Sequence, residues 1–198
     1  EKKSTCEGGS YIVIPAIEDY ERDFPMIHHP EYIIDWEESN RLLDLAHEVF
    51  DGILHVRRKN TWWWTLGLTW DYINLRGMEE FMCDFVTEPE YVEKMLDLLC
   101  DGKLKMLDFL EENNLLAQNT EGTYVGSGGF GYTSEIPTLA EGEHVTTHDM
   151  WGFCDSQETV SVNPEMYGEF ILPRHKKILE RFPLTCYGCC EPYNVRWK

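Results

Sequence analysis

The sequence predicts an α/β fold in which mostly parallel strands alternate with helices. Two observations predict it. Short apolar runs alternate along the chain with longer runs whose apolar residues recur at helical spacing, which is the sequence rhythm of parallel sheets covered by helices. Polar, acidic and sulfur-bearing residues gather directly after the apolar runs, where the carboxyl ends of parallel strands hold ligands and catalytic groups.

The first part of the chain predicts little regular structure. Residues 1–10 are polar, and residues 16–34 are acidic and aromatic without a period, so we expect a surface excursion. The apolar run 11–15 predicts one short strand. His28 and His29 are interpreted as an exposed loop pair rather than a metal site.

Capping patterns mark the next helices. Asp35 and Glu38 form a capping box before a helix that ends at Gly52. Residues 87–90 form a second capping box, with a proline in the first turn, before a long helix that we expect to bend near Gly102. Further elements follow from apolar runs and periodicity: strands at 53–56, 61–68 and 122–126, and a helix over 70–85.

The second half predicts one more strand, one helix and a final strand. Residues 151–158 are aromatic and end in polar side chains. Asn163 caps the helix that follows, and Pro173 should kink it. The last strand is the cysteine-rich stretch 185–192 itself. We assign residues 1–34 to an irregular lead-in and residues 35–198 to the α/β domain.

Composition excludes several classes of protein. A chain of 198 residues with 42% hydrophobic residues is too apolar to be disordered. The formal net charge of −19 disfavours nucleic acid and anionic membrane surfaces as partners. Seven cysteines without disulfide-framework spacing, no signal peptide and no apolar run of about 18 residues predict a cytoplasmic protein with reduced thiols.

The stretch 185–192 is the strongest candidate for a metal site. It reads as a buried strand whose carboxyl end carries Cys189, Cys190 and Glu191, a set of soft sulfur ligands beside one acid. The alternative is that these cysteines simply pack in the core as small hydrophobic residues. That alternative suits Cys186 better than the adjacent pair.

Other candidates follow neighbouring strands. The glycine-rich loop 127–132 predicts a small-molecule site, because glycines let the backbone approach a ligand closely. The predicted site residues are Gly128, Gly129 and Tyr132 of this loop and Trp151 of the next strand. No phosphate-binding glycine motif is present.

Asp155, Gln157 and Glu158 are candidate catalytic residues, although Gln157 and Glu158 also suit a polar pair at a helix entry. Of the adjacent residues Trp62, Trp63 and Trp64, at least one ring should face outward and could line a pocket.

Three blocks, in order, resemble the uroporphyrinogen decarboxylase superfamily. Residues 75–92 are similar to a helix pair of that family, and residues 151–173 resemble its FDSW…SP…F…EF…P block. Residues 187–192 lie where its methyltransferase members carry His-x-Cys, with Cys189 at the cysteine position and Tyr187 at the histidine position. The resemblance covers about residues 60–192, and it implies a partial TIM barrel.

The resemblance implies a zinc-dependent methyltransferase that acts on a methylated corrinoid or a related methyl donor. Cys189 would bind zinc, and Cys190 or Glu191 would replace the missing histidine. The alternatives are a metal-free decarboxylase-type enzyme and a non-catalytic small-molecule-binding fragment. A complete barrel takes about 250 residues, so we expect another copy or another segment of the protein to supply the missing strands. The resemblance also implies a corrinoid protein as a partner.

Overall fold

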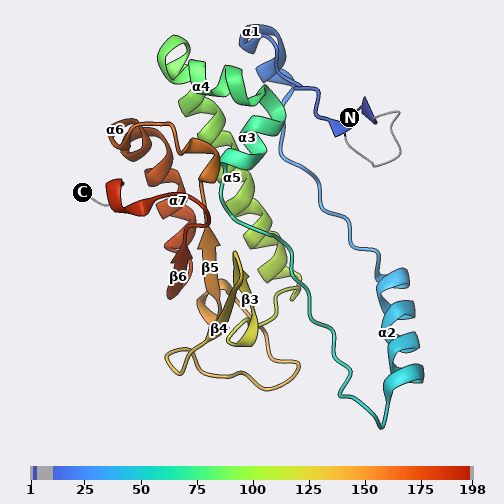
Figure 1. Cartoon of the computed structure of the whole chain (residues 1–198). Coiled ribbons are helices and arrows are strands. Elements are labelled where there is room, and N and C mark those ends of the chain that lie inside the picture. The colour runs from blue at the N-terminus through green and yellow to red at the C-terminus, as the bar shows by residue number, and fades with distance from the viewer. Residues whose placement is uncertain (1, 4–10, 197–198) are drawn as a thin grey trace.

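The computed structural model describes residues 2–3 and 11–196, in which helices pack against small two-stranded sheets (Figure 1). The predicted polar lead-in over residues 4–10 lies outside these residues. The helices are α1 (Tyr20–Asp23), α2 (Trp36–Phe50), α3 (Thr69–Arg76), α4 (Met78–Thr87), α5 (Pro89–Glu112), α6 (Pro164–Met166) and α7 (Leu172–Leu179). The strands are β1 (Lys2–Lys3), β2 (Tyr11–Ile12), β3 (Glu121–Gly126), β4 (Gly129–Tyr132), β5 (Trp151–Cys154) and β6 (Leu184–Tyr187).

One strand pair is parallel, and it carries the centre of the fold. Strands β5 and β6 pair from Trp151 with Leu184 to Cys154 with Tyr187, and α6 and α7 form the connection between them. The pairs β1–β2 and β3–β4 are antiparallel. The prediction of mostly parallel strands was therefore wrong for the pairs β1–β2 and β3–β4. The glycine-rich loop is the turn and second strand of the hairpin β3–β4, because the chain folds back there onto β3.

Two predicted strands did not form as strands. Residues 53–56 follow α2 with Ile53 and Leu54 exposed, and no neighbouring strand supplies hydrogen bonds to them. The run 61–68 is extended beside β5, but it makes a single ladder-like bond, from the amide of Leu66 to the carbonyl of Phe153 at 2.9 Å. β-Propensity alone is insufficient where no partner backbone lies alongside.

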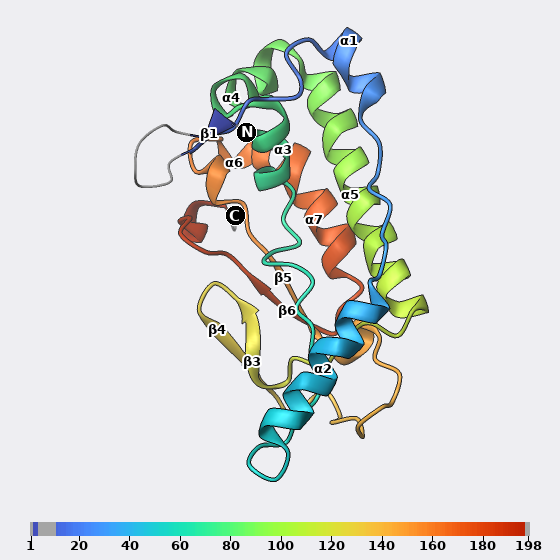
Figure 2. The ribbon, with the colours of Figure 1, turned by 90° about the vertical axis from the view of Figure 1, so that its right-hand side faces the viewer.

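Helix α2 forms as predicted but lies apart from the other helices (Figures 1 and 2). The Asp35 side chain accepts a hydrogen bond from the amide of Glu38 at 2.9 Å, which is one half of the predicted capping box. The other half is absent, because the Glu38 carboxylate binds Arg41 at 2.6 and 2.7 Å. No residue of α2 is buried. The helical apolar face that the sequence contains is thus exposed, including Leu42, Leu45 and Val49.

Helix α5 is continuous through Gly102, contrary to the predicted bend. The glycine has a different use. A Cβ at this position would lie 3.0 Å from Nδ1 of His29, so the missing side chain makes room for the extended segment that crosses the helix. The predicted capping box at residues 87–90 is also absent, because the hydroxyl of Thr87 bonds to the carbonyl of Cys83 within α4.

The helical segment between β5 and β6 changes its winding at Pro173. Asn163 caps α6 by accepting from the amide of Met166 at 2.8 Å. A π-helical stretch, Tyr167–Ile171, follows, and Pro173 then lies in the first turn of α7. The predicted kink stays a prediction, because a proline in the first turn of a helix leaves no backbone bond unmade.

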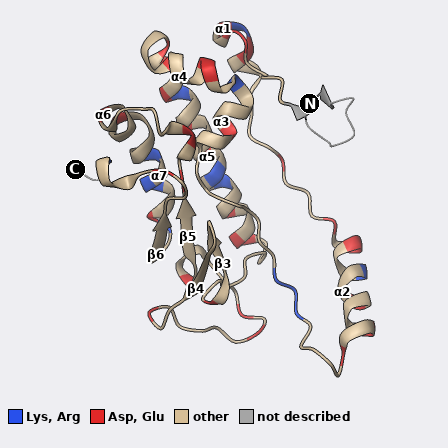
Figure 3. Ribbon diagram, viewed as in Figure 1, with Lys and Arg blue, Asp and Glu red and all other residues tan. Residues whose placement is uncertain are grey.

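Helices α5 and α7 lie side by side on one face of β5 and β6 (Figure 2). Ion pairs line the edge of this contact: Arg174 with Asp97 at 2.8 Å, Lys177 with Asp101 at 3.0 Å, and Arg181 with Glu111 at 3.0 Å. Figure 3 shows acidic residues on most of the helices, with basic residues close together on α7 and on the segment after α2. Of these pairs, Lys177 with Asp101 is exposed on both sides and contributes little, so the apolar core is the main contact between the helices.

The lead-in is tied into the core rather than running over the surface. Ile17 and Tyr20 are buried, and the Tyr20 hydroxyl donates to the Asp84 carboxylate at 2.6 Å. Arg76 binds the same carboxylate through two nitrogens at 2.8 and 3.1 Å and also contacts the carbonyl of Glu18. The predicted irregular excursion over residues 16–34 thus contains α1 and part of the core.

Candidate functional site

A cavity of about 440 Å³ lies between the end of β5, the start of α3 and the middle of α5. We call it the tryptophan pocket. Its lining combines four indole rings with acids, one base and small or apolar residues: Trp62, Trp63, Trp64, Thr65, Gly67, Trp70, Asp71, Lys103, Met106, Asp155, Gln157 and Glu158. The three predicted catalytic residues and the tryptophan run, which are about 90 positions apart in sequence, therefore meet in one cavity.

The tryptophans are held by contacts on both sides of their extended segment. Trp63 packs edge-on against Phe182 in the interior. Trp62 and Trp64 are exposed, as the alternation of side chains along an extended chain requires, and this confirms the expected outward ring. The indole nitrogen of Trp62 donates to the carbonyl of Leu115 at 2.7 Å, and Trp64 stacks on Tyr124. Each of the three rings therefore has a contact of its own that orients it.

Asp155 and Glu158 give the pocket an acidic end. Burial raises the pKa of the Asp155 carboxyl above its usual value, and the charges of Glu158 and Glu191 add to this rise. Glu158 is half-buried and accepts a hydrogen bond from the hydroxyl of Thr69 at 2.6 Å. A carboxyl that holds its proton more tightly beside a second carboxylate is an arrangement suited to general acid and base chemistry.

Gly67 is required for this arrangement. A Cβ at residue 67 would lie 2.3 Å from the backbone oxygen of Asp155 and 3.0 Å from its carboxylate. Any side chain would push the two segments apart, because a backbone atom cannot move aside as a flexible side chain does. The close approach places Asp155 directly against the tryptophan segment.

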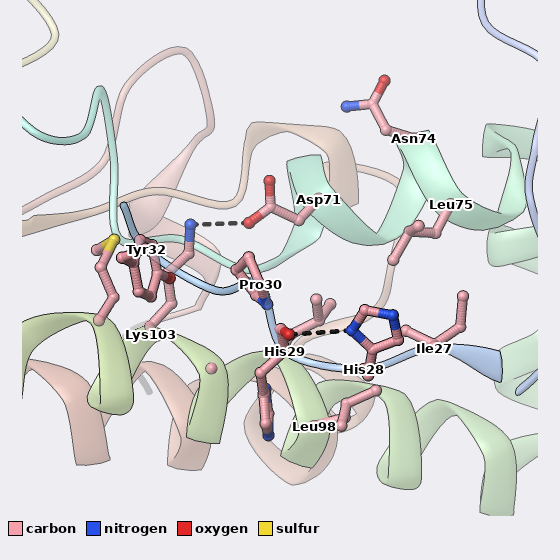
Figure 4. Close-up of a pocket in the computed structure, with 13 residues that line it drawn as sticks. Ile27, His28, His29, Pro30, Tyr32, Asp71, Asn74, Leu75, Leu98 and Lys103 are labelled. Atoms are coloured by element: carbon pink, nitrogen blue, oxygen red, sulfur yellow. Dashed lines mark hydrogen bonds and ion pairs between the residues drawn. The ribbon is translucent and has the colours of Figure 1, made fainter. Parts of the chain in front are cut away.

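An ion pair forms the boundary between this pocket and a second cavity. Lys103 on α5 binds Asp71 on α3 at 2.8 Å, and both residues line both cavities (Figure 4). The second cavity, of about 390 Å³, lies under the segment that carries His28 and His29. His28 is exposed there. Among the described residues, the hydrogen-bond partner of its ring is the backbone oxygen of His29.

The predicted metal stretch lies at the carboxyl end of β6, next to the β3–β4 turn. The sulfur of Cys189 lies 2.8 Å from the hydroxyl of Ser127, and the sulfur of Cys190 lies 3.5 Å from that of Cys189. The contact with Cys189 raises the pKa of the exposed Cys190 thiol. The glycine-rich loop and the cysteine stretch, which the sequence places after different strands, therefore meet here. Neither Cys189 nor Cys190 lines the tryptophan pocket.

Glu191 stabilises the chain instead of facing an open site. It is buried, and its carboxylate accepts hydrogen bonds from the amides of Ser156 and Cys189 at 2.8 and 2.9 Å and from the hydroxyl of Tyr193 at 3.0 Å. These bonds join the ends of β5 and β6 and occupy both carboxylate oxygens.

The residues at this end do not complete a zinc site. Two sulfurs on one tetrahedral zinc lie about 3.8 Å apart, which the cysteine pair nearly matches. A catalytic zinc takes three protein ligands, however, and Glu191 is engaged elsewhere. Within residues 2–3 and 11–196, no group of three or more His, Cys, Asp or Glu residues is placed to hold a metal. The predicted ligand set therefore does not fit zinc as it stands.

Tyr187, at the histidine position of the resemblance, points into the core. Its hydroxyl lies 2.6 Å from Nδ1 of the buried His175 and also bonds to Tyr167. The other ring nitrogen of His175 accepts from the amide of Leu68 at 3.0 Å, so the proton belongs on Nδ1. This network links β6, α7 and the segment that enters α3.

The predicted cofactor residues lie outside the tryptophan pocket. Gly128 is in the exposed turn of the β3–β4 hairpin, Gly129 is the exposed first residue of β4, and Tyr132 is exposed at the end of β4. Gly128 has a φ of 76°, which the turn requires and which glycine adopts without strain. Trp151 is half-buried and packs close to Gly131.

Trp70, Asp71 and Lys103 line the pocket, and the sequence did not single them out as site residues. Trp70 and Asp71 read as a helix start, which they are. Lys103 lies among polar residues of a long amphipathic helix, where a lysine normally faces solvent. No local signal could have identified it, because its position over the pocket depends on how α3 crosses α5.

Comparison with known proteins adds no relative. No family model, curated protein or solved structure matches the chain. Among the described residues, there is no helix with the length and apolarity needed to cross a membrane.

Proposed function

We propose that the chain is the substrate-binding part of a methyltransferase of the uroporphyrinogen decarboxylase superfamily, and that the tryptophan pocket holds the substrate. The observation that carries this proposal is the convergence of Asp155, Gln157 and Glu158 with the tryptophan run in one cavity. The resemblance of residues 151–173 supports the family, and the methyl group would be exchanged with a corrinoid that a partner protein presents.

The residues of the pocket have separable roles in this proposal. The indole rings bind the apolar part of the substrate and exclude water from it. Glu158 accepts the proton that the acceptor thiol loses, and Asp155, whose pKa burial raises, keeps its proton and donates a hydrogen bond to the substrate. Zinc on Cys189 and Cys190 stays a prediction that requires a further ligand, and no step here depends on it.

The test uses methylcobalamin as the methyl donor and 2-mercaptoethanol as the acceptor, with the appearance of cob(I)alamin followed by absorbance in the absence of oxygen. The methyl cation passes from cobalt to the thiolate, and both bonding electrons remain on cobalt. We expect Asp155→Asn and Glu158→Gln to lower the rate by about 10²-fold or more. The exposed Glu165→Gln, which lies outside the pocket, serves as the control and should retain the full rate.

A rate equal to that without protein would contradict the methyltransferase proposal. The metal-free decarboxylase alternative is favoured by one observation, the raised pKa of Asp155, because a protonated carboxyl can protonate the carbanion that loss of CO₂ leaves. That enzyme would release CO₂ from a porphyrinogen, and Cys189→Ser would not change its rate.

We further propose that the α/β unit is part of a TIM barrel. Support comes from β5, α7 and β6, since two parallel strands joined by a helix form the repeating unit of such barrels. A second copy of the chain covers the open edge of this partial barrel. The two copies contact each other through the exposed apolar face of α2.

Light scattering during size-exclusion chromatography should give twice the chain mass or more. Leu45→Glu on α2 should shift the protein to the monomer, because it places a charge in the apolar face. Val160→Glu, at an exposed apolar residue in a turn away from α2, should leave the assembly intact. A parent protein that is monomeric and unfolds cooperatively would contradict this arrangement.

A further inference from the structure

We infer that the tryptophan pocket binds a small organic cation whose charged nitrogen carries alkyl groups, that is, a methylated ammonium compound. The inference rests on the proposed function only in taking this pocket as the substrate site. It is argued from the rings that line the cavity, from its charges and from its size.

The rings favour a cation with an apolar surface. Four tryptophans line the pocket, and Trp62, Trp64 and Trp70 have exposed fractions of 37%, 56% and 51% that a ligand could cover. Indole is the aromatic group that attracts cations most strongly over its face. A metal ion or a bare ammonium keeps its water against such rings, whereas alkyl groups on nitrogen spread the charge and give up their water readily.

The charges favour a cation over an anion. Glu158 and Asp155 supply carboxyl groups to the lining, and the third acid, Asp71, is paired with Lys103. Lys103 is the one base among the described residues that line the cavity, and its ammonium is already bound to Asp71 at 2.8 Å. A carboxylate or phosphate ligand would thus meet acids with no free base, in a chain of net charge −19.

The size favours a small ligand. A cavity of about 440 Å³ is at the lower end of the range for small-molecule pockets. It would hold a trimethylammonium head and a short chain, whereas a porphyrinogen with its many carboxylates suits neither the volume nor the charge.

The experiment compares choline with 3,3-dimethylbutan-1-ol, in which carbon replaces the charged nitrogen and the shape is unchanged. Tryptophan fluorescence and isothermal titration calorimetry on the whole chain measure both affinities. We expect choline to bind at least about tenfold more tightly, because the cation–π and carboxylate contacts exist only for the charged compound. Equal or tighter binding of the neutral compound would overturn the inference, and so would the binding of neither.

Two variants locate the site. Trp64→Leu and Glu158→Gln should each weaken choline binding about tenfold, and Glu158→Gln should leave the weak affinity for the neutral compound unchanged. Trp36→Leu is the matched control, since Trp36 is a similarly exposed tryptophan outside the pocket. Loss of choline binding in the control but not in Trp64→Leu would place the cation elsewhere and overturn the assignment.

The two proposals fail separately. Methyl transfer from methylcobalamin without choline binding would leave the enzyme proposal standing and reject the cation. Selective choline binding without methyl transfer would leave the cation site standing and reject the methyltransferase.

Discussion

Replacing Asp84 with alanine is expected to lower the free energy of unfolding by about 3–5 kcal/mol, the usual cost of removing one partner of a buried ion pair. The Asp84 carboxylate is 3% exposed and Arg76 is 12% exposed. Arg76 binds it through two nitrogens, and the Tyr20 hydroxyl donates to it as well. Without the carboxylate, the guanidinium loses its charged partner inside the protein and keeps only backbone carbonyls, and the Tyr20 phenol keeps only the Tyr72 hydroxyl.

Urea unfolding followed by circular dichroism measures this effect. The matched control is Asp101→Ala, which removes the partner of Lys177 in a pair that is more than half exposed on both sides. Exposed pairs contribute about 0–1 kcal/mol, so this variant should unfold almost as the parent does. Similar losses in the two variants would show that Asp84 does not hold the lead-in to the corner of α3 and α4.

Stability is expected to fall by about 2 kcal/mol between pH 7 and pH 5 because of His175. Burial lowers the pKa of His175 from 6.5 to about 3, and the positive charges of Arg196 and Lys103 add to this effect. The unfolded chain therefore binds the proton first. The contribution of the neutral ring is complete above about pH 6.5, and it declines as the pH falls from there toward 3.

Unfolding in urea at a series of pH values gives the slope, about 1.4 kcal/mol per pH unit for one proton once the pH is well below 6.5. His175→Gln keeps an acceptor for the amide of Leu68 but cannot titrate, so its stability should be nearly independent of pH over this range. His47→Gln, at an exposed histidine on α2, should keep the slope of the parent. An unchanged slope in His175→Gln would assign the acid sensitivity to another group.

Local features of the structure were readable from the sequence because their causes are local. Asp35 and Asn163 cap helices through bonds to amides three residues away. The outward tryptophans follow from the alternation of side chains along an extended chain. Each of these depends on a few neighbouring residues and on no distant contact.

The strand pattern and the long helix required tertiary information. Residues 53–56 have the composition of a strand but no partner backbone, and the glycine-rich loop became a hairpin by pairing with β3. At Gly102, the missing side chain accommodates His29 from a segment some seventy positions away and leaves the helix unbroken. A sequence pattern records that a residue is small, but not what fills the space beside it.

The sequence by itself determined the helix caps, the class of chain that mixes helices with strands, and Asp155, Gln157, Glu158 and the tryptophans as residues to examine. Only the tertiary structure decided that these residues share a cavity, because the shared cavity depends on the close approach of Gly67 to the backbone of Asp155. It also decided that Glu191 ties two strand ends together and that Lys103 reaches the pocket. Such pairings join residues far apart in the chain, and their geometry is set by packing that no local pattern encodes.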